Sequence, residues 1–331
     1  MVETENNMTE TTVGEEAFDA RHHYAARVKR PKRSVLERRE NRIAFLFILV
    51  PLIGFLLFTF ASICFSVFIA FTDYNVLRQE FSWVWFDNFV TLFSAQSLYS
   101  RQFANAILNT VISMLSLPVG LLLGLLCAVL CASEYNIRTS KFYRTLLYLP
   151  AVSSLVAVNI IWRYLFHNDQ QFEANRGLIN TMLGANINWL SEEWPIRFAI
   201  IIKNVWSGMG GMMILYYAGM MNISHDYFEA AELDGANEWH KFKSITLPML
   251  SPVTFYIIIT GVINGLQSYT DSATFANGSV YAQTVVYFIW DRGINSLNYG
   301  LASAASVFLS VVIMIITVVQ FRVSNKWVFE M

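Results

Sequence analysis

The run IAFLFILVPLIGFLLFTFASICFSVFIAF at residues 43–71 contains no charged side chain. A membrane-spanning helix needs about 20 mostly apolar residues, each of which adds about 1.5 Å along its axis. The run is longer than this requirement and begins too far from Met1 to be the apolar region of a cleaved signal peptide. We therefore expect a retained, tilted transmembrane helix that anchors the chain.

The same character continues through the rest of the sequence. Hydrophobic residues make up 55% of the chain and charged residues 14%, whereas a soluble domain carries roughly 25% charged residues. This composition predicts an all-α membrane protein with six transmembrane helices, at about residues 43–71, 103–131, 145–166, 198–221, 250–269 and 301–321. Pro118 predicts a kink in the second of these stretches.

Basic residues predict the orientation of these helices, because Lys and Arg accumulate in cytoplasmic loops. With both termini on one side, that side holds 16 Lys and Arg residues and the other side holds 7. We therefore expect a multi-pass protein of the plasma or inner membrane with both termini cytoplasmic. The segments 72–102, 167–197 and 270–300 would then lie outside the membrane on the extracytoplasmic side, and their aromatic residues indicate a docking surface, an interfacial belt, or both.

Residues 1–42 differ from the body of the chain. They contain 9 basic and 8 acidic residues and little that could form an apolar core, which predicts a disordered cytoplasmic tail. The basic cluster at residues 21–42 either fixes the orientation of the first helix, the reading we favour, or contacts anionic membrane lipid.

Motifs of other protein classes are absent from the sequence. The net charge of −1 argues against a nucleic-acid surface. There is no G-x-x-x-x-G-K-[ST] phosphate loop, the 5 histidines lack metal-ligand spacing, and no G-x-S-x-G or H-E-x-x-H motif occurs. We expect no catalytic residue, metal or cofactor in this chain. The spans also lack a series of carboxylates that could relay protons, so energy for uphill transport would come from elsewhere.

The most informative segment is the predicted cytoplasmic loop NISHDYFEAAELDGANEWHKFKSITL at residues 222–247. Ser224 is a good N-cap and Gly235 a good C-terminal stop, which predicts a short helix at residues 226–234. Ala230 and Ala231 leave one side without bulk, and Glu229 and Glu232 could meet a basic partner. A second short helix is expected at residues 237–246, ending before Pro248.

The loop carries a group of residues with fixed spacing: Glu229-Ala230-Ala231, Asp234-Gly235-Ala236, Phe242, Ile245, Leu247-Pro248 and Pro252. This group resembles the EAA loop of permease subunits from binding-protein-dependent ABC importers. The resemblance to the carbohydrate-type, maltose-permease-like members extends to Arg144, Pro150, Trp162, Phe166, Gly177, Asn180, Leu183, Tyr299, Gly300, Ala302, Ala304 and Ala305.

The resemblance implies a type I importer permease fold over residues 43–325 and no enzyme activity in this chain. It implies that Glu229, Ala230, Ala231, Asp234 and Gly235 belong to a helix that couples the permease to an ATPase. The implied partners are a second homologous permease, two ATPase subunits that bind the ATP, and an extracytoplasmic solute-binding protein.

Polar residues within the spans indicate where a substrate would lie. Thr260, Asn264, Gln267 and Asp271 are spaced for one face of the fifth helix. On the fourth helix, Asn204 and Gly208 are four residues apart, with Trp206 between them. Amides, glycines and an aromatic ring suit a neutral, polyhydroxylated ligand such as a sugar.

The family resemblance assigns sugar contacts to Asn204, Trp206, Gly208 and Asn264, to which the polar face adds Thr260 and Gln267. Two alternatives remain open: the partner permease holds the ligand, or these polar groups only bond helix to helix.

Lys203 is expected to extend its ammonium to the membrane surface. Alternatively, it attracts an acidic substrate, such as a uronic-acid oligosaccharide or glycerol phosphate. A rival function from another class is an ion-coupled secondary transporter, which needs no coupling loop and no ATP.

Overall fold

The computed structural model describes residues 35–74, 82–94, 97–132, 137–168 and 176–328. These residues are helical or irregular, apart from an isolated antiparallel bridge between Thr72 and Trp83. The chain forms two units, residues 1–63 and 64–331, which are described separately.

The first unit contains α2 (Val35–Gly54) and the π-helical segment η1 (Phe55–Phe60), and α3 (Ala61–Ala70) begins in it. Helix α2 begins at Val35, within the segment that we assigned to the tail, whereas residues 1–34 lie outside the described residues. Large apolar side chains such as Phe47 and Phe58 are 77% and 79% exposed. Such a surface is stable in lipid, as expected for a membrane anchor.

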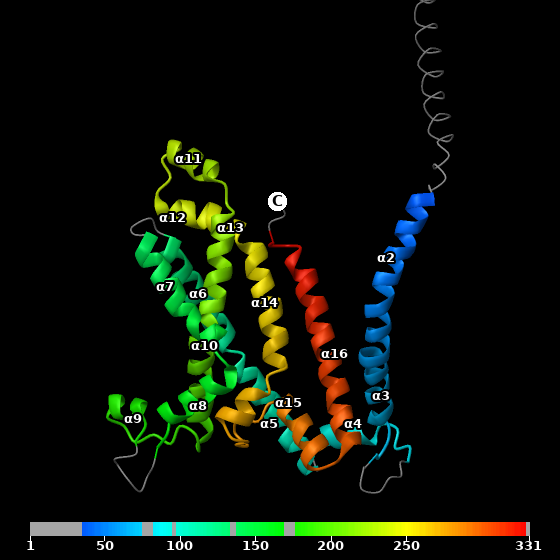
Figure 1. Cartoon of the computed structure of the whole chain (residues 1–331). Helices are drawn as coiled ribbons and strands as arrows, with labels where there is room; N and C mark the ends of the chain where they lie inside the picture. The colour runs from blue at the N-terminus through cyan, green and yellow to red at the C-terminus, as the bar shows by residue number, and fades with distance from the viewer. Residues whose placement is uncertain (1–34, 75–81, 95–96, 133–136, 169–175, 329–331) are drawn as a thin grey trace, which may run out of the picture. The chain divides into compact units, whose positions relative to one another are not determined.

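Most of the long helices lie in the second unit (Figure 1). Four helical stretches of the described chain are long and apolar enough to cross a membrane: Ile43–Ala70, Leu98–Ala132, Glu193–Met221 and Tyr299–Ser324. Of these, Leu98–Ala132 consists of α5 (Leu98–Ser113) and α6 (Ser116–Ala132), while α10 is Glu193–Met221 and α16 is Tyr299–Ser324. The helical path is interrupted at residues 114–115, close to Pro118, whose nitrogen has no proton to donate to the Met114 carbonyl.

The third expected span is broken into α7 (Ile137–Val152) and α8 (Leu155–Leu165), which meet at 97°. Our expectation of one continuous helix at residues 145–166 was therefore wrong. Pro150 cannot donate to the Leu146 carbonyl. The Ser153 hydroxyl donates to the Leu149 carbonyl at 2.8 Å, and Ser154, with φ −57° and ψ 123°, leaves the helical conformation.

A second bent pair consists of residues 238–249 and α14 (Ser251–Leu266), which meet at 56°. Residues 238–249 comprise α12 (Glu238–Lys241), η3 (Phe242–Thr246) and α13 (Leu247–Met249). The loop helix thus continues through Pro248, which we expected to lie beyond its end. The break follows at Leu250, where the Ser251 hydroxyl donates to the Pro248 carbonyl at 2.6 Å. Counting each bent pair as one span gives up to six spans.

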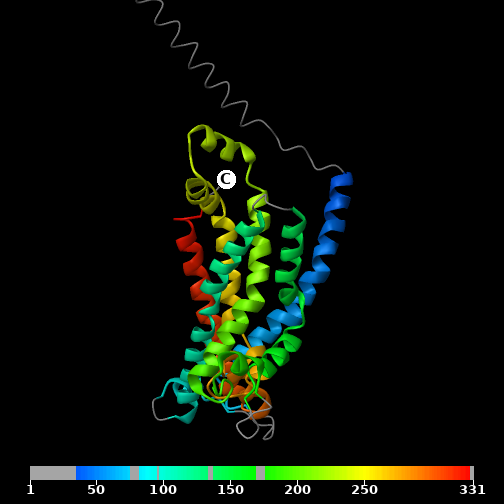
Figure 2. The ribbon, with the colours of Figure 1, turned by 90° about the vertical axis from the view of Figure 1, so that its left-hand side faces the viewer.

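The remaining described helices are short and connect the long ones: α4 (Asp87–Phe93), α9 (Leu178–Leu183), α11 (His225–Leu233), η4 (Asp271–Phe275), α15 (Val285–Trp290) and η5 (Asp291–Asn295). Within the second unit, α11 and α12 lie at one end of α10, and α8 and α15 lie at the opposite end (Figures 1 and 2). The end of α16 lies near the start of α14, where Phe321 and Phe255 have ring centroids 5.4 Å apart.

Glycine allows the central helices to pack closely. A Cβ atom on Gly210 of α10 would overlap the backbone carbonyl of Leu147 on α7, and one on Gly124 of α6 would lie 2.8 Å from Cβ of Met212. Close backbone approach of this kind is a principal source of helix association in lipid.

Gly210→Ala should therefore destabilise the protein, because the added methyl group forces α7 and α10 apart. Gly211→Ala is the matched control, since its Cβ would meet Ala151 at an ordinary 3.9 Å and alanine favours helix by about 1 kcal/mol. The measurement is the apparent Tm in detergent. A lower Tm for Gly210→Ala alone is expected, and equal values would contradict this account of the packing.

Candidate functional sites

A cavity of about 310 Å³ lies between α5, α6, α10 and α14. Its surface combines amides, hydroxyls and small or apolar side chains, which is a suitable lining for a small hydroxylated ligand. The lining residues are Ser113, Met114, Ser116, Leu117, Leu155, Asn204, Met212, Gly261, Asn264, Gly265, Ser268, Tyr269, Thr270 and Asp271.

The structure brings Asn204 and Asn264, two of the six candidate substrate contacts, together in the lining of this cavity. It does not place the other four candidates in the lining. Trp206 instead packs against Trp162 with ring centroids 5.4 Å apart, and a Cβ atom on Gly208 would meet Met212.

The expected polar face of the fifth span is interrupted. Helix α14 ends at Leu266, and Gln267 is its exposed C-cap. The Thr260 hydroxyl donates to the Tyr256 carbonyl at 2.6 Å within its own helix. Asp271 therefore reaches the cavity from η4, beyond the break, and does not lie on a continuous helix face with Thr260.

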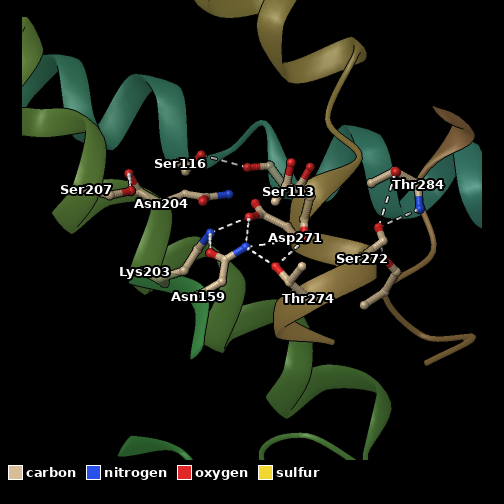
Figure 3. Close-up of polar contacts among 12 residues, drawn as sticks. Ser113, Ser116, Asn159, Lys203, Asn204, Ser207, Asp271, Ser272, Thr274 and Thr284 are labelled. Carbon is tan, nitrogen blue, oxygen red and sulfur yellow. Dashed lines mark hydrogen bonds and ion pairs between the residues drawn. The ribbon is translucent and has the colours of Figure 1, made fainter. Parts of the chain in front are cut away.

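A buried polar network surrounds Asp271 (Figure 3). Lys203 of α10 donates from Nζ to Asp271 Oδ1 and, at 2.8 Å, to Asn159 Oδ1. Asn159 of α8 donates from Nδ2 to Asp271 Oδ1 at 3.2 Å and to Thr274 Oγ1 at 2.8 Å. The network thus ties α8, α10 and η4 together.

Lys203 is 0% exposed, so the expectation that its ammonium reaches the membrane surface was wrong. The ammonium does not need to reach water, because Asp271 neutralises it. A buried charge is tolerated when it is paired with an opposite charge and hydrogen-bonded. A lysine and an aspartate in neighbouring apolar stretches were the sequence signal for this pair. The partner of Lys203 was missed because the two residues are 68 positions apart.

A second, water-sized cavity of about 10 Å³ adjoins the first, since Ser113, Ser268 and Asp271 line both. Arg197 and Asn109 also line this small cavity. Arg197 donates from Nε to Asn109 Oδ1 at 3.0 Å, and the Asn109 amide donates to the Gln283 carbonyl at 3.1 Å. Hydrogen-bonded side chains therefore form part of the small cavity's lining.

The other candidate site is helix α11, at the end of the second unit where α10 terminates (Figure 1). The Ser224 side chain caps its start by accepting from the Asp226 amide at 3.4 Å. Gly235 has φ +78°, and its amide and that of Ala236 donate to the carbonyls of Glu232 and Ala231, both at 2.9 Å. This is the hydrogen-bond pattern of a glycine C-terminal stop, so the predicted helix and its end are confirmed.

Helix α11 buries none of its side chains within the described structure. Leu233 is 90% exposed and Tyr227 is 54% exposed. Glu229 forms a solvent-exposed contact with His225 at 3.0 Å. Exposed apolar groups on a well-formed polar helix indicate a surface that meets another macromolecule.

Lys241 forms two ion pairs, one that connects α12 to Glu232 of α11 and one with Glu238 within α12. Its ammonium lies 2.6 Å from Glu232 Oε1 and 2.8 Å from Glu238 Oε1. The hydrogen bond and positive charge of Lys241 lower the pKa of the Glu232 carboxyl, so this contact is present at neutral pH and is lost as the pH falls through that lowered pKa. Glu232, which we expected to meet a basic partner, thus forms its ion pair with a residue of the same loop.

Comparison with known proteins identifies the class of molecule that combines a lipid-facing helical body with an exposed loop helix. Residues 120–329 match the family described as the binding-protein-dependent transport system inner membrane component. The chain belongs to this family of ABC transporter permeases. Its relatives are transport proteins and not enzymes.

Two relatives and one solved structure illustrate the similarity. The chain is 30% identical over 307 residues to the probable ABC transporter permease protein YesP of Bacillus subtilis, covering 90% of this chain and 95% of YesP. It is 26% identical to the arabinooligosaccharides transport system permease protein AraP of Halalkalibacterium halodurans, covering 72% and 76%. A bacterial alginate ABC transporter, crystallised with its alginate pentasaccharide-bound periplasmic protein, matches with a TM-score of 0.75, 25% identity and coverage of 89% and 98%.

Lys241→Met should loosen α11, because Glu232 and Glu238 lose their shared cation and repel each other. Hydrogen exchange of the α11 amides should become faster in this variant. Lys243→Met removes an exposed lysine two residues away and serves as the control, with unchanged exchange expected. Identical exchange in both variants would show that the Lys241 ion pairs do not order the loop.

Proposed function

We propose that the chain is the membrane-spanning permease subunit of an ABC importer for a sugar or oligosaccharide. The observation that carries the proposal is the combination of an exposed helix with a glycine stop in the EAA loop and an amide-lined cavity between the spans. ATP hydrolysis on separate ATPase subunits supplies the energy, and this chain contributes no cofactor.

The proposed topology has six spans in residues 43–325, with residues 1–42 as a cytoplasmic tail and residues 222–247 as the coupling loop. Two observations support cytoplasmic ends. Lys and Arg favour that side 16 to 7, and the end of α16 lies at the end of the second unit from which α11 projects (Figure 2). The protein then resides in the plasma or inner membrane.

In the proposed complex, α11 inserts into a cleft of an ATPase subunit. Glu229, Ala230 and Ala231 supply its charged and small contact residues, and Asp234 and Gly235 end the helix and turn the chain back. Closure of two ATPase subunits on ATP would move α11 and, through Lys241, the helix that leads into α14. A second permease and an extracytoplasmic solute-binding protein complete the assembly.

Gly235→Pro should abolish the stimulation of ATP hydrolysis by substrate-loaded binding protein in vesicles. Proline fixes φ near −65° and has no amide proton, so it fits neither the φ of +78° nor the hydrogen bond to Glu232. Gly235→Asn is the control, because asparagine tolerates this left-handed conformation, and it should retain most stimulation. Full stimulation in the proline variant would refute the coupling role of α11.

The substrate site is proposed at the 310 Å³ cavity, with Asn204 and Asn264 donating to and accepting from ligand hydroxyls. Trp206, Gly208, Thr260 and Gln267 are proposed to join the pathway when the spans rearrange during transport. The carbohydrate named for AraP supports a sugar ligand. An acidic sugar is the second candidate, because the related alginate transporter imports an acidic polysaccharide.

Asn264→Leu should reduce uptake about five- to tenfold, the effect of losing a hydrogen bond worth about 1–1.4 kcal/mol. Basal ATP hydrolysis should not change, since the coupling loop is intact. Asn105→Leu provides the matched control, because Asn105 is exposed on α5, and its uptake should remain normal. Equal uptake in both variants would mean that Asn264 only bonds helix to helix.

A further inference from the structure

The 310 Å³ cavity has an unusual charge arrangement. Of the described residues that line it, Asp271 alone carries a formal charge. The compensating cation, Lys203, is 0% exposed and lies behind Asp271, outside the lining. A ligand in the cavity therefore meets a carboxylate, and the ammonium that neutralises it is covered.

The hydrogen bonds hold Lys203 in this covered position (Figure 3). Its ammonium donates to Asp271 Oδ1 and to Asn159 Oδ1, and the Asn159 amide donates to the same Asp271 oxygen. The Lys203 ammonium and the Asn159 amide both donate to Oδ1 of Asp271. The other carboxylate oxygen, Oδ2, takes no part in these two hydrogen bonds and can accept one from a ligand hydroxyl.

We propose that Asp271 determines the charge selectivity of the transport pathway: paired with Lys203, it admits neutral hydroxylated ligands and excludes anionic ones. This inference rests on the proposed function and specifies its substrate class. It favours a neutral sugar over the acidic candidate.

The physical basis is the position of the site between membrane helices, where the surroundings are less polar than water. Charges there interact more strongly than in water, so a ligand carboxylate is repelled by Asp271 while Asn159 and Asp271 occupy the ammonium that could attract it. A neutral sugar loses nothing to charge repulsion, and its hydroxyls can both donate to Asp271 and exchange hydrogen bonds with Asn204 and Asn264.

The test compares cellobiose with cellobiouronic acid, in which a hydroxymethyl group is replaced by a carboxylate. Their binding to the full chain, purified with its companion subunits but without a solute-binding protein, is measured by saturation-transfer NMR at neutral pH. The signal that remains in Asn204→Leu/Asn264→Leu is subtracted as binding outside the cavity. The quantity of interest is the ratio of acid to neutral signal.

Wild-type protein should favour cellobiose. Asp271→Asn leaves the Lys203 charge uncompensated and should raise the acid-to-neutral ratio about tenfold or more, the scale on which one charge in a site of low polarity changes affinity. Lys203→Met leaves the carboxylate unpaired and should not raise the ratio. The double variant Lys203→Met/Asp271→Asn restores neutrality and should return to the wild-type ratio even where a single variant folds poorly.

A merely structural ion pair would change the binding of both sugars equally and leave the ratio constant in every variant, which would overturn the proposal. A wild-type preference for cellobiouronic acid would also overturn it and would favour the acidic substrate. Binding of neither sugar to the wild-type cavity would instead reject the carbohydrate function on which the proposal rests.

Discussion

The constraint on which this structure depends is that backbone polar groups in lipid must find partners within the protein. A continuous helix satisfies its backbone groups by its own hydrogen bonds, whereas at a break in a helix side chains must bond to the backbone groups that are left over. Helix α14 ends at Leu266, and side chains bond to backbone carbonyls that follow it. Asn159 donates to the Thr270 carbonyl at 3.3 Å, and the Thr284 hydroxyl donates to the Ser268 carbonyl. Residues 268–271, which follow this break, form one part of the cavity lining.

The two candidate sites are joined by one length of chain. Helix α11 is connected to α12 by the ion pair between Glu232 and Lys241, and the chain from α12 through η3 and α13 leads to α14, which carries Asn264 into the cavity. A displacement of α11 by a partner would therefore act on a helix of the cavity wall. An importer requires a connection of this kind to transmit movement from the ATPase to the substrate site.

Local features were predictable from the sequence because they depend on neighbouring residues. Ser224 and Gly235 define the ends of α11 through contacts within a few positions, and the uncharged stretches predict lipid-exposed helices. Interactions between distant residues were not predictable. The Lys203–Asp271 pair and the Glu232–Lys241 pair required knowledge of which helices lie together. The sharp bend after Val152 was missed because proline is also compatible with a gentle kink in a continuous helix.

The central claim is that this chain works as the permease of an ATP-driven importer and not as an ion-coupled carrier. The most direct test is to purify the complex through this chain, reconstitute it in vesicles with its solute-binding protein, and measure uptake of radiolabelled sugar. The account predicts uptake that requires ATP at the cytoplasmic face and persists when ionophores dissipate the ion gradients. Uptake that continues without ATP and collapses with the gradient would contradict it.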